Sequence, residues 1–252
     1  MRLRDLSPSA LRGLVVAICI KVAIMGYLAL RGVDFALHQY VAGAAFAPRL
    51  EGQPDMALMV ACLLPQAAFV FVTCDYLPSG LAAQATSAMP RLGTRTRWAA
   101  RRTLGLLAFS AAYVLVGSLV GAALLAAMGG GLPDGALTIF GRALPLELLA
   151  SALLALLANV AALWLEPVMA MALVLGVHGG VLIFQAFLPL SSGLALAPWL
   201  PSARTVLAWH DVAGVAAGAP GMGIASSCAL LAVLVLASAA VTLRSVSRCD
   251  IL

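Results

Sequence analysis

Three polar residues, Lys21, Asn159 and His178, lie inside apolar runs of the sequence that are long enough to cross a bilayer as helices. A charge near the centre of a membrane costs roughly 2.5 to 3.5 kcal/mol on translocon scales, so Lys21 should face protein, water or the headgroups. Two interpretations of Lys21 stay open. It meets an acidic group of a substrate or of a second subunit, or its long stem carries the ammonium to the cytoplasmic headgroups.

Asn159 and His178 suggest milder chemistry. The amide of Asn159 can form hydrogen bonds across helices. An isolated histidine in a membrane can relay protons or bind a metal, but no acidic residue accompanies His178 in its apolar run. We therefore expect His178 to pack closely among neighbouring glycines, and the spacing of Gly176 and Gly180 predicts a close helix contact there.

Catalytic and metal-binding motifs are missing from the sequence. It contains no HExxH, no GxSxG and no CxxC, and Gly129, Gly130 and Gly131 lack the lysine that a phosphate-binding loop requires. We therefore predict no metal site and no bound nucleotide in this chain. The rival class, an intramembrane enzyme, would need a nucleophile and a base, or metal ligands, at one depth. Ser191 lies outside the apolar run that carries His178, which disfavours that alternative.

The composition indicates an all-α polytopic membrane protein made of one transmembrane domain, residues 1–252. The chain is 63% hydrophobic and 10% charged, with a mean hydropathy of +1.05. Its apolar runs are continuous rather than alternating, which favours helices over a barrel. We predict six transmembrane helices, at about 13–30, 56–74, 103–128, 146–165, 168–190 and 225–243.

The arginines predict the orientation of these spans. With both termini in the cytoplasm, the basic residues near the N-terminus, in the segment before residue 103 and at the C-terminus all fall on the cytoplasmic side. The net charge of +5 is then explained by anionic lipid headgroups, and no nucleic-acid partner is needed. Lys21 interrupts what would otherwise resemble a signal peptide at the N-terminus, so the first apolar run is expected to stay in the membrane as a span.

The predicted connections differ in length. Residues 76–102 form a long basic cytoplasmic segment, in which 79–89 is expected to be a short helix that Pro90 ends. Glu166 and Pro167 make a tight turn on the same side. On the outer side, residues 191–224 are proline-containing yet fairly apolar, so we expect short helices that dip partly into the membrane.

Two sequence runs resemble a known family. The run Pro90-Arg91-Leu92-Gly93-Thr94-Arg95-Thr96-Arg97-Trp98 before the third predicted span, and the C-terminal Asp250-Ile251-Leu252, are similar to those of the type 2 permease family of ATP-binding-cassette transporters. The resemblance extends over the whole chain, in its length and its predicted six-span layout. It implies an exporter-like permease subunit in the cell membrane, expected to be the bacterial inner membrane. It also implies a second permease, identical or related, and two copies of a separate subunit that binds ATP and Mg.

The resemblance also implies roles for individual residues. Residues 79–89 would be the helix that couples the permease to the ATPase. Residues 1–12 would form an interfacial elbow helix, and Glu166 and Pro167 would make a second, smaller contact. The predicted coupling residues are Ser79, Leu81, Gln84, Ser87, Met89, Arg91 and Glu166. The alternative is that the basic segment only anchors the chain to phospholipid headgroups.

The scarcity of charges within the spans suggests a hydrophobic or amphipathic substrate. The resemblance implies a drug, a peptide, a lipid or a glycan. Lys21, Asn159 and His178 are the candidate pathway or interface residues. Besides an enzyme, the remaining alternative is a membrane anchor or sensor that keeps an ATPase partner but transports nothing.

Overall fold

The computed structural model describes residues 12–16, 18–20, 22–24, 49–50, 53–54, 56–85, 95–127, 136–210 and 222–248. This part of the chain is helical apart from one pair of two-residue antiparallel strands. The elements are β1 (Arg49–Leu50), β2 (Gln53–Pro54), α3 (Met56–Thr73), α4 (Tyr76–Ala85), α5 (Arg95–Ala127), α6 (Ala136–Ala161), α7 (Pro167–Phe187), α8 (Leu190–Leu196), the 3-10 turns η3 (Ala197–Trp199), η4 (Ala203–Thr205) and η5 (Leu207–Trp209), and α9 (Ile224–Arg248).

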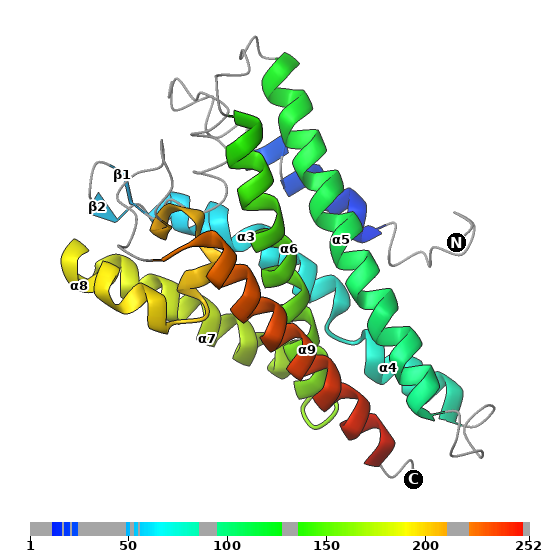
Figure 1. The fold of residues 1–252 in the computed structure, drawn as a ribbon. Coiled ribbons are helices and arrows are strands. Elements are labelled where there is room, and N and C mark those ends of the chain that lie inside the picture. Colours follow the sequence, from blue (N-terminus) through cyan, green and yellow to red (C-terminus); the bar gives the residue numbers. More distant parts are fainter. Residues whose placement is uncertain are drawn as a thin grey trace.

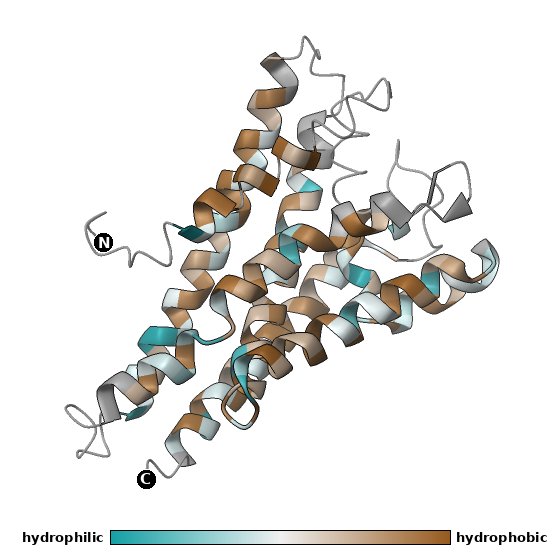
Figure 2. Ribbon diagram, turned by 180° about the vertical axis from the view of Figure 1, so that it is seen from behind, coloured by the Kyte–Doolittle hydropathy of each residue, from teal (hydrophilic) through white to brown (hydrophobic). Residues whose placement is uncertain are grey.

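Four helices of the described chain, α5, α6, α7 and α9, are long and apolar enough to cross a membrane. Their outward faces carry large apolar side chains such as Leu119, Phe184 and Leu236, each at least 60% exposed. In Figure 2, hydrophobic residues predominate along these helices. Such faces are unfavourable in water and favourable in hydrocarbon, so the chain is a membrane protein.

The structure describes the other two predicted spans, 13–30 and 56–74, to different extents. Residues 12–16, 18–20 and 22–24 are helical, and the rest of the predicted span 13–30 lies outside the described residues. The predicted span 56–74 coincides with α3, an 18-residue helix. Gly13 lies against α3 and α5, because a Cβ at this glycine would come within 3.0 Å of both Val72 and Phe109.

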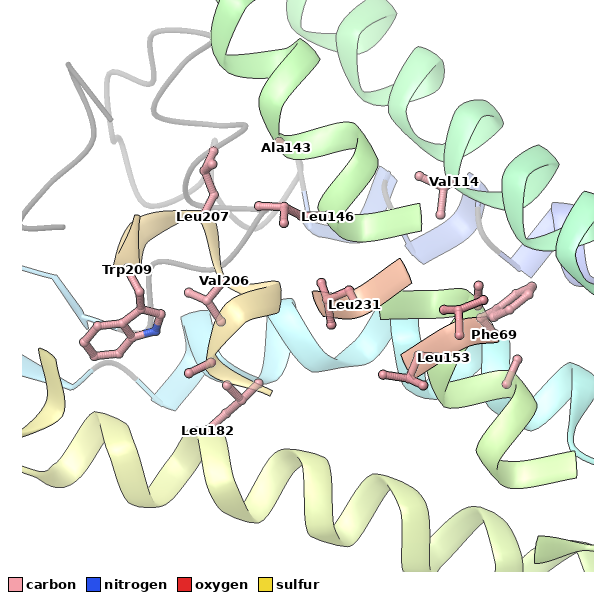
Figure 3. Packing of buried hydrophobic residues seen from close by; sticks show 14 of the residues in the cluster. Phe69, Val114, Ala143, Leu146, Leu153, Leu182, Val206, Leu207, Trp209 and Leu231 are labelled. Carbon is pink, nitrogen blue, oxygen red and sulfur yellow. The ribbon is translucent and has the colours of Figure 1, made fainter. Parts of the chain in front are cut away.

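Helix α6 is the centre of the bundle and packs against α3, α5, α7 and α9 (Figure 1). Of the residues in its most apolar stretch, 61% are buried, against 33% in α5 and 22% in α7 and in α9. In Figure 3, Leu146 and Leu153 lie in one core with Leu182 and Leu231. A movement of α6 must therefore displace most of the bundle.

Several helices extend beyond the predicted spans. Helix α5 begins at Arg95 rather than at residue 103, so Arg95, Arg97, Arg101 and Arg102 are helical, and α6 begins at Ala136 rather than 146. Arginine is a good helix former, and Pro145 is accommodated within α6. Helix α4 begins at Tyr76, three residues before the predicted helix, and Pro78 fits because the first turn of a helix has no partner for its N–H group.

The helices alternate in direction, so their ends gather at the two ends of the bundle. Figures 1 and 2 both show α4, the start of α5, the turn between α6 and α7, and the C-terminal end of α9 at one end. Helix α8 lies toward the opposite end. Arg97, Arg101 and Arg244, which belong to the first group of segments, are exposed.

Candidate functional site

The candidate site is the α4 corner, which we define as the turn Cys74–Asp75, helix α4 and the side chains of α5 and α6 that hold them. Helix α3 ends at Thr73 and α4 begins at Tyr76, so only two residues separate them. The N–H of Ser79 donates to the carbonyl of Asp75 at 2.9 Å, which starts the first turn of α4. The corner is therefore a tight joint rather than a loop.

Asn159 of α6 enters this joint. Its Oδ1 accepts a hydrogen bond from the backbone N–H of Leu77 at 2.9 Å. Its Nδ2 donates to the carbonyl of Thr73 at 2.7 Å and to that of Ala155 at 2.9 Å. Asn159 is fully buried. One side chain thus satisfies a carbonyl at the end of α3 and an N–H at the start of α4, groups that a helix leaves unpaired at its ends.

Arg102 of α5 holds α4 from the other side. Its guanidinium carbon lies 4.9 Å from the centre of the Tyr76 ring and 5.7 Å from that of the Trp98 ring, both within the range of cation–π attraction. Gly80 allows this approach, because a Cβ there would lie 3.1 Å from Cζ of Arg102 and 3.2 Å from Cζ2 of Trp98. Helix α4 is therefore packed onto α5 as well as bonded to α6.

The predicted coupling residues fall partly on this corner. Ser79 is exposed and Leu81 is half-buried on α4, and Gln84 lies in its last turn. Glu166 is exposed and is the N-cap residue of α7, with Pro167 as the first helical residue. Ser87, Met89 and Arg91 lie outside the described residues.

The two candidate pathway residues that the structure describes, Asn159 and His178, do not share a site. Asn159 belongs to the α4 corner, His178 lies on α7, and Lys21 is outside the described residues. His178 is 4% exposed and lines a cavity of about 390 Å³ between α6, α7 and the segment around η4. Its Nε2 has no hydrogen-bond partner among the described residues.

The His178 cavity is lined mainly by aliphatic side chains, including Leu153, Leu157, Leu173 and Val177. Its volume falls within the roughly 300 to 1,000 Å³ of small-molecule pockets. Within the described chain, no group of three His, Cys, Asp or Glu residues could hold a metal ion. The cavity can therefore receive an apolar molecule, and His178 is the one ionisable residue among the described residues that line it.

The glycine contact near His178 differs from the prediction. Gly179, rather than Gly176 or Gly180, faces another helix, because a Cβ there would lie 3.4 Å from Leu63 of α3. Around Gly176 and Gly180 the described residues leave open space. The four-residue spacing of small residues is therefore not used for a contact within this part of the chain.

The opposite end of the bundle is organised around Arg204. Its Nε donates to the carbonyl of Pro198 at 2.8 Å, and one terminal nitrogen donates to Ser227 Oγ at 3.3 Å, which joins the 3-10 turns to α9. Nearby, Nδ1 of the fully buried His210 lies 2.8 Å from the carbonyl of Val206. Burial lowers the pKa of His210 below its ordinary value, backbone hydrogen bonding at Val206 and Leu207 partly opposes this, and the charge of Arg204 lowers it by a smaller amount.

The sequence reasoning missed the residues that anchor α4. Trp98 and Arg102 are four residues apart on one helix, a spacing that places two side chains on the same face and so gave a usable signal. The bonds from Asn159 to Thr73 and Leu77 had no such signal, because those residues are 86 and 82 positions away. No protein-family model, curated protein or solved structure matches the chain.

Proposed function

We propose that this chain is the permease subunit of an ATP-binding-cassette transporter, and that it moves a hydrophobic or amphipathic substrate with ATP hydrolysed by a separate subunit. The observation that carries the proposal is the α4 corner: a short helix bonded to α6 and stacked on α5. The resemblance of the basic segment and the C-terminus to type 2 permeases supports the same function. ATP and Mg belong to the partner subunit in this proposal.

The α4 corner suits an element on which a partner acts. Force applied to α4 reaches α6 through the hydrogen bond from Leu77 to Asn159, and it reaches α5 through the contact between Tyr76 and Arg102. Asn159 also bonds to Thr73, so α6 is tied to the end of α3 at the same point. Helix α6 touches most of the bundle, so it spreads the displacement. Exposed Ser79 and Glu166 are the proposed contacts with the ATPase, one on α4 and the other at the turn before α7.

The complex is proposed to contain two ATPase subunits and two permeases, the second identical or related, in the cell membrane of a bacterium. Arg97 and Arg101 are exposed near the α4 corner, where they suit anionic lipid headgroups or an acidic protein surface. The aliphatic lining of the His178 cavity favours an apolar substrate over a hydrophilic ion.

The test is to co-express the chain with ATPase subunits encoded beside its gene, and to measure co-purification and ATP-dependent uptake of a lipophilic fluorescent dye into inverted vesicles. Replacing Ser79 by Arg should weaken the complex, because a long charged side chain would stand in the contact. Ser192→Arg on exposed α8, toward the other end, is the matched control and should leave the complex intact. Dye transport by the purified chain alone would refute the proposal.

A further inference from the structure

Asn159 occupies a special position in the hydrogen-bond pattern between α3 and α4. In a continuous helix, the N–H of Leu77 would donate to the carbonyl of Thr73, four residues earlier. Here each of these two groups bonds to the amide of Asn159 instead, at 2.9 Å and 2.7 Å. The side-chain amide therefore stands in for a peptide group, inserted into the ladder at the point where the helix is interrupted.

Insertion of a side chain into the backbone ladder is a recognised cause of a sharp helix bend. The hydroxyl of Thr73 contributes in the same place, since it donates to the carbonyl of Phe69 at 2.7 Å, a bond that also tends to bend helices. Helix α3 continues to Thr73 and α4 begins at Tyr76, so the break is confined to Cys74 and Asp75. The direction of α4 is thus set where Asn159 enters.

The choice of asparagine at position 159 needs a reason. It is fully buried in a helix whose neighbouring core residues are Ala155, Leu156 and Ala158, and asparagine is a poorer helix former than leucine or alanine. Its amide has one acceptor oxygen and two N–H donors, and all three functions are used, with Ala155 taking the second N–H. A leucine would fill the volume but could not bond to either end of the broken ladder.

We infer that Asn159 is a positioning residue, which sets the angle of α4 relative to α3 and thereby makes movement of α4 productive for transport. Without the amide, the Leu77 N–H and the Thr73 carbonyl recombine and α4 swings toward the axis of α3. The inference rests on the proposed function for its transport half only. Its structural half concerns the isolated chain and holds with or without an ATPase.

The structural half is tested by spin labels on two exposed positions, Ala82→Cys of α4 and Leu165→Cys beside the start of α7, in a cysteine-free background. Asn159→Ala should shift or broaden the distance between the labels in the purified, detergent-solubilised chain. Ser151→Ala, which alters a buried residue of α6 about two turns away, is the control and should leave the distance unchanged. Unchanged distances in Asn159→Ala would overturn the inference.

Asn159→Ser is a second variant that keeps the proposal testable if alanine prevents folding. The hydroxyl of this serine can donate a hydrogen bond to the carbonyl of Ala155, as serines in membrane helices do. The side chain is too short to bridge Leu77 and Thr73. It should give the same change in distance as alanine. A distance like that of the unmodified chain in a folded Asn159→Ser protein would also overturn the inference.

The transport half is measured on the complex, without labels, as dye transported per ATP hydrolysed. Asn159→Ala and Asn159→Ser should lower this ratio several-fold while the ATPase still co-purifies, and Ser151→Ala should not. A shifted α4 with an unchanged ratio would contradict the coupling role. If the unmodified chain binds no ATPase, the proposed function fails, whereas the distance measurement still decides the structural half.

Discussion

Buried polar side chains of this bundle bond mainly to backbone carbonyls. Asn159 donates to Thr73, Tyr113 to Pro65 and Gln185 to Gly193, and each pair joins different helices. In a membrane such bonds contribute about 0.6 kcal/mol on average and up to about 1.7 kcal/mol. These hydrogen bonds mainly determine how the helices are positioned, because each one holds a side chain of one helix against a particular backbone group of another.

Substitutions of Tyr113 can separate the stability that its hydrogen bond contributes from the stability that its buried ring contributes. Its hydroxyl donates to the carbonyl of Pro65 at 2.8 Å, and its ring lies 4.7 Å from that of Phe69 between centres. Tyr113→Phe removes only the bond and should cost about 1 kcal/mol, whereas Tyr113→Ala removes the buried ring as well and should cost about 3 kcal/mol or more. Thermal unfolding in detergent measures both. Equal losses from the two substitutions would contradict the packing described.

His210 makes stability depend on pH. Burial lowers its pKa in the folded chain, so the unfolded chain binds a proton more readily below its ordinary pKa of 6.5. The stabilising effect of a neutral His210 is therefore complete above about pH 6.5 and is lost as the pH falls toward the lowered folded value.

The melting temperature of the chain in detergent should fall as the pH decreases from about 7 to 5. His210→Gln, which does not titrate, should show a smaller fall over the same range. If both proteins lose stability equally with acid, the titration of His210 is not responsible.

At the scale of elements, Arg102 is predicted to hold α4 in place. Arg102→Leu removes its cation–π contact with Tyr76 of α4, which contributes about 0.5 to 1 kcal/mol at an exposed site. Hydrogen exchange of the α4 amides should therefore be faster in this variant. Arg101→Leu, at an exposed position of the same helix, should exchange like the unmodified chain. Similar protection of α4 in all three proteins would rule out the anchor.

The elements were predictable where hydropathy alone decides, as for the helices α5, α6, α7 and α9. Their ends were not, because Arg95 to Arg102 and the residues before Leu146 continue a helix although charges or a proline would suggest a stop. A short helix was predicted at 79–89, and α4 begins three residues earlier, at Tyr76. Its attachment was not predictable, because Asn159 meets Thr73 and Leu77 only after α3, α4 and α6 have packed together.

At the scale of the whole molecule, the two ends of the bundle are predicted to lie on opposite sides of the membrane. The turn carrying Glu166 lies at the end with α4, and Ser192 of α8 lies toward the opposite end (Figure 1). In cells that express a variant of the chain without its native cysteines, Glu166→Cys should react with a membrane-impermeant maleimide only after the cells are permeabilised. Ser192→Cys should react in intact cells as well. Labelling of both from outside intact cells would contradict this orientation.

The central claim is that an ATPase subunit acts on this bundle through α4. Its most direct test places a photo-reactive amino acid at the position of Ser79 and, separately, at that of Ser192, in membranes that contain the co-expressed ATPase. The account predicts an ATP-sensitive cross-link to the ATPase from Ser79 and none from Ser192. A cross-link from Ser192 alone, or from neither position in a complex that still transports, would contradict it.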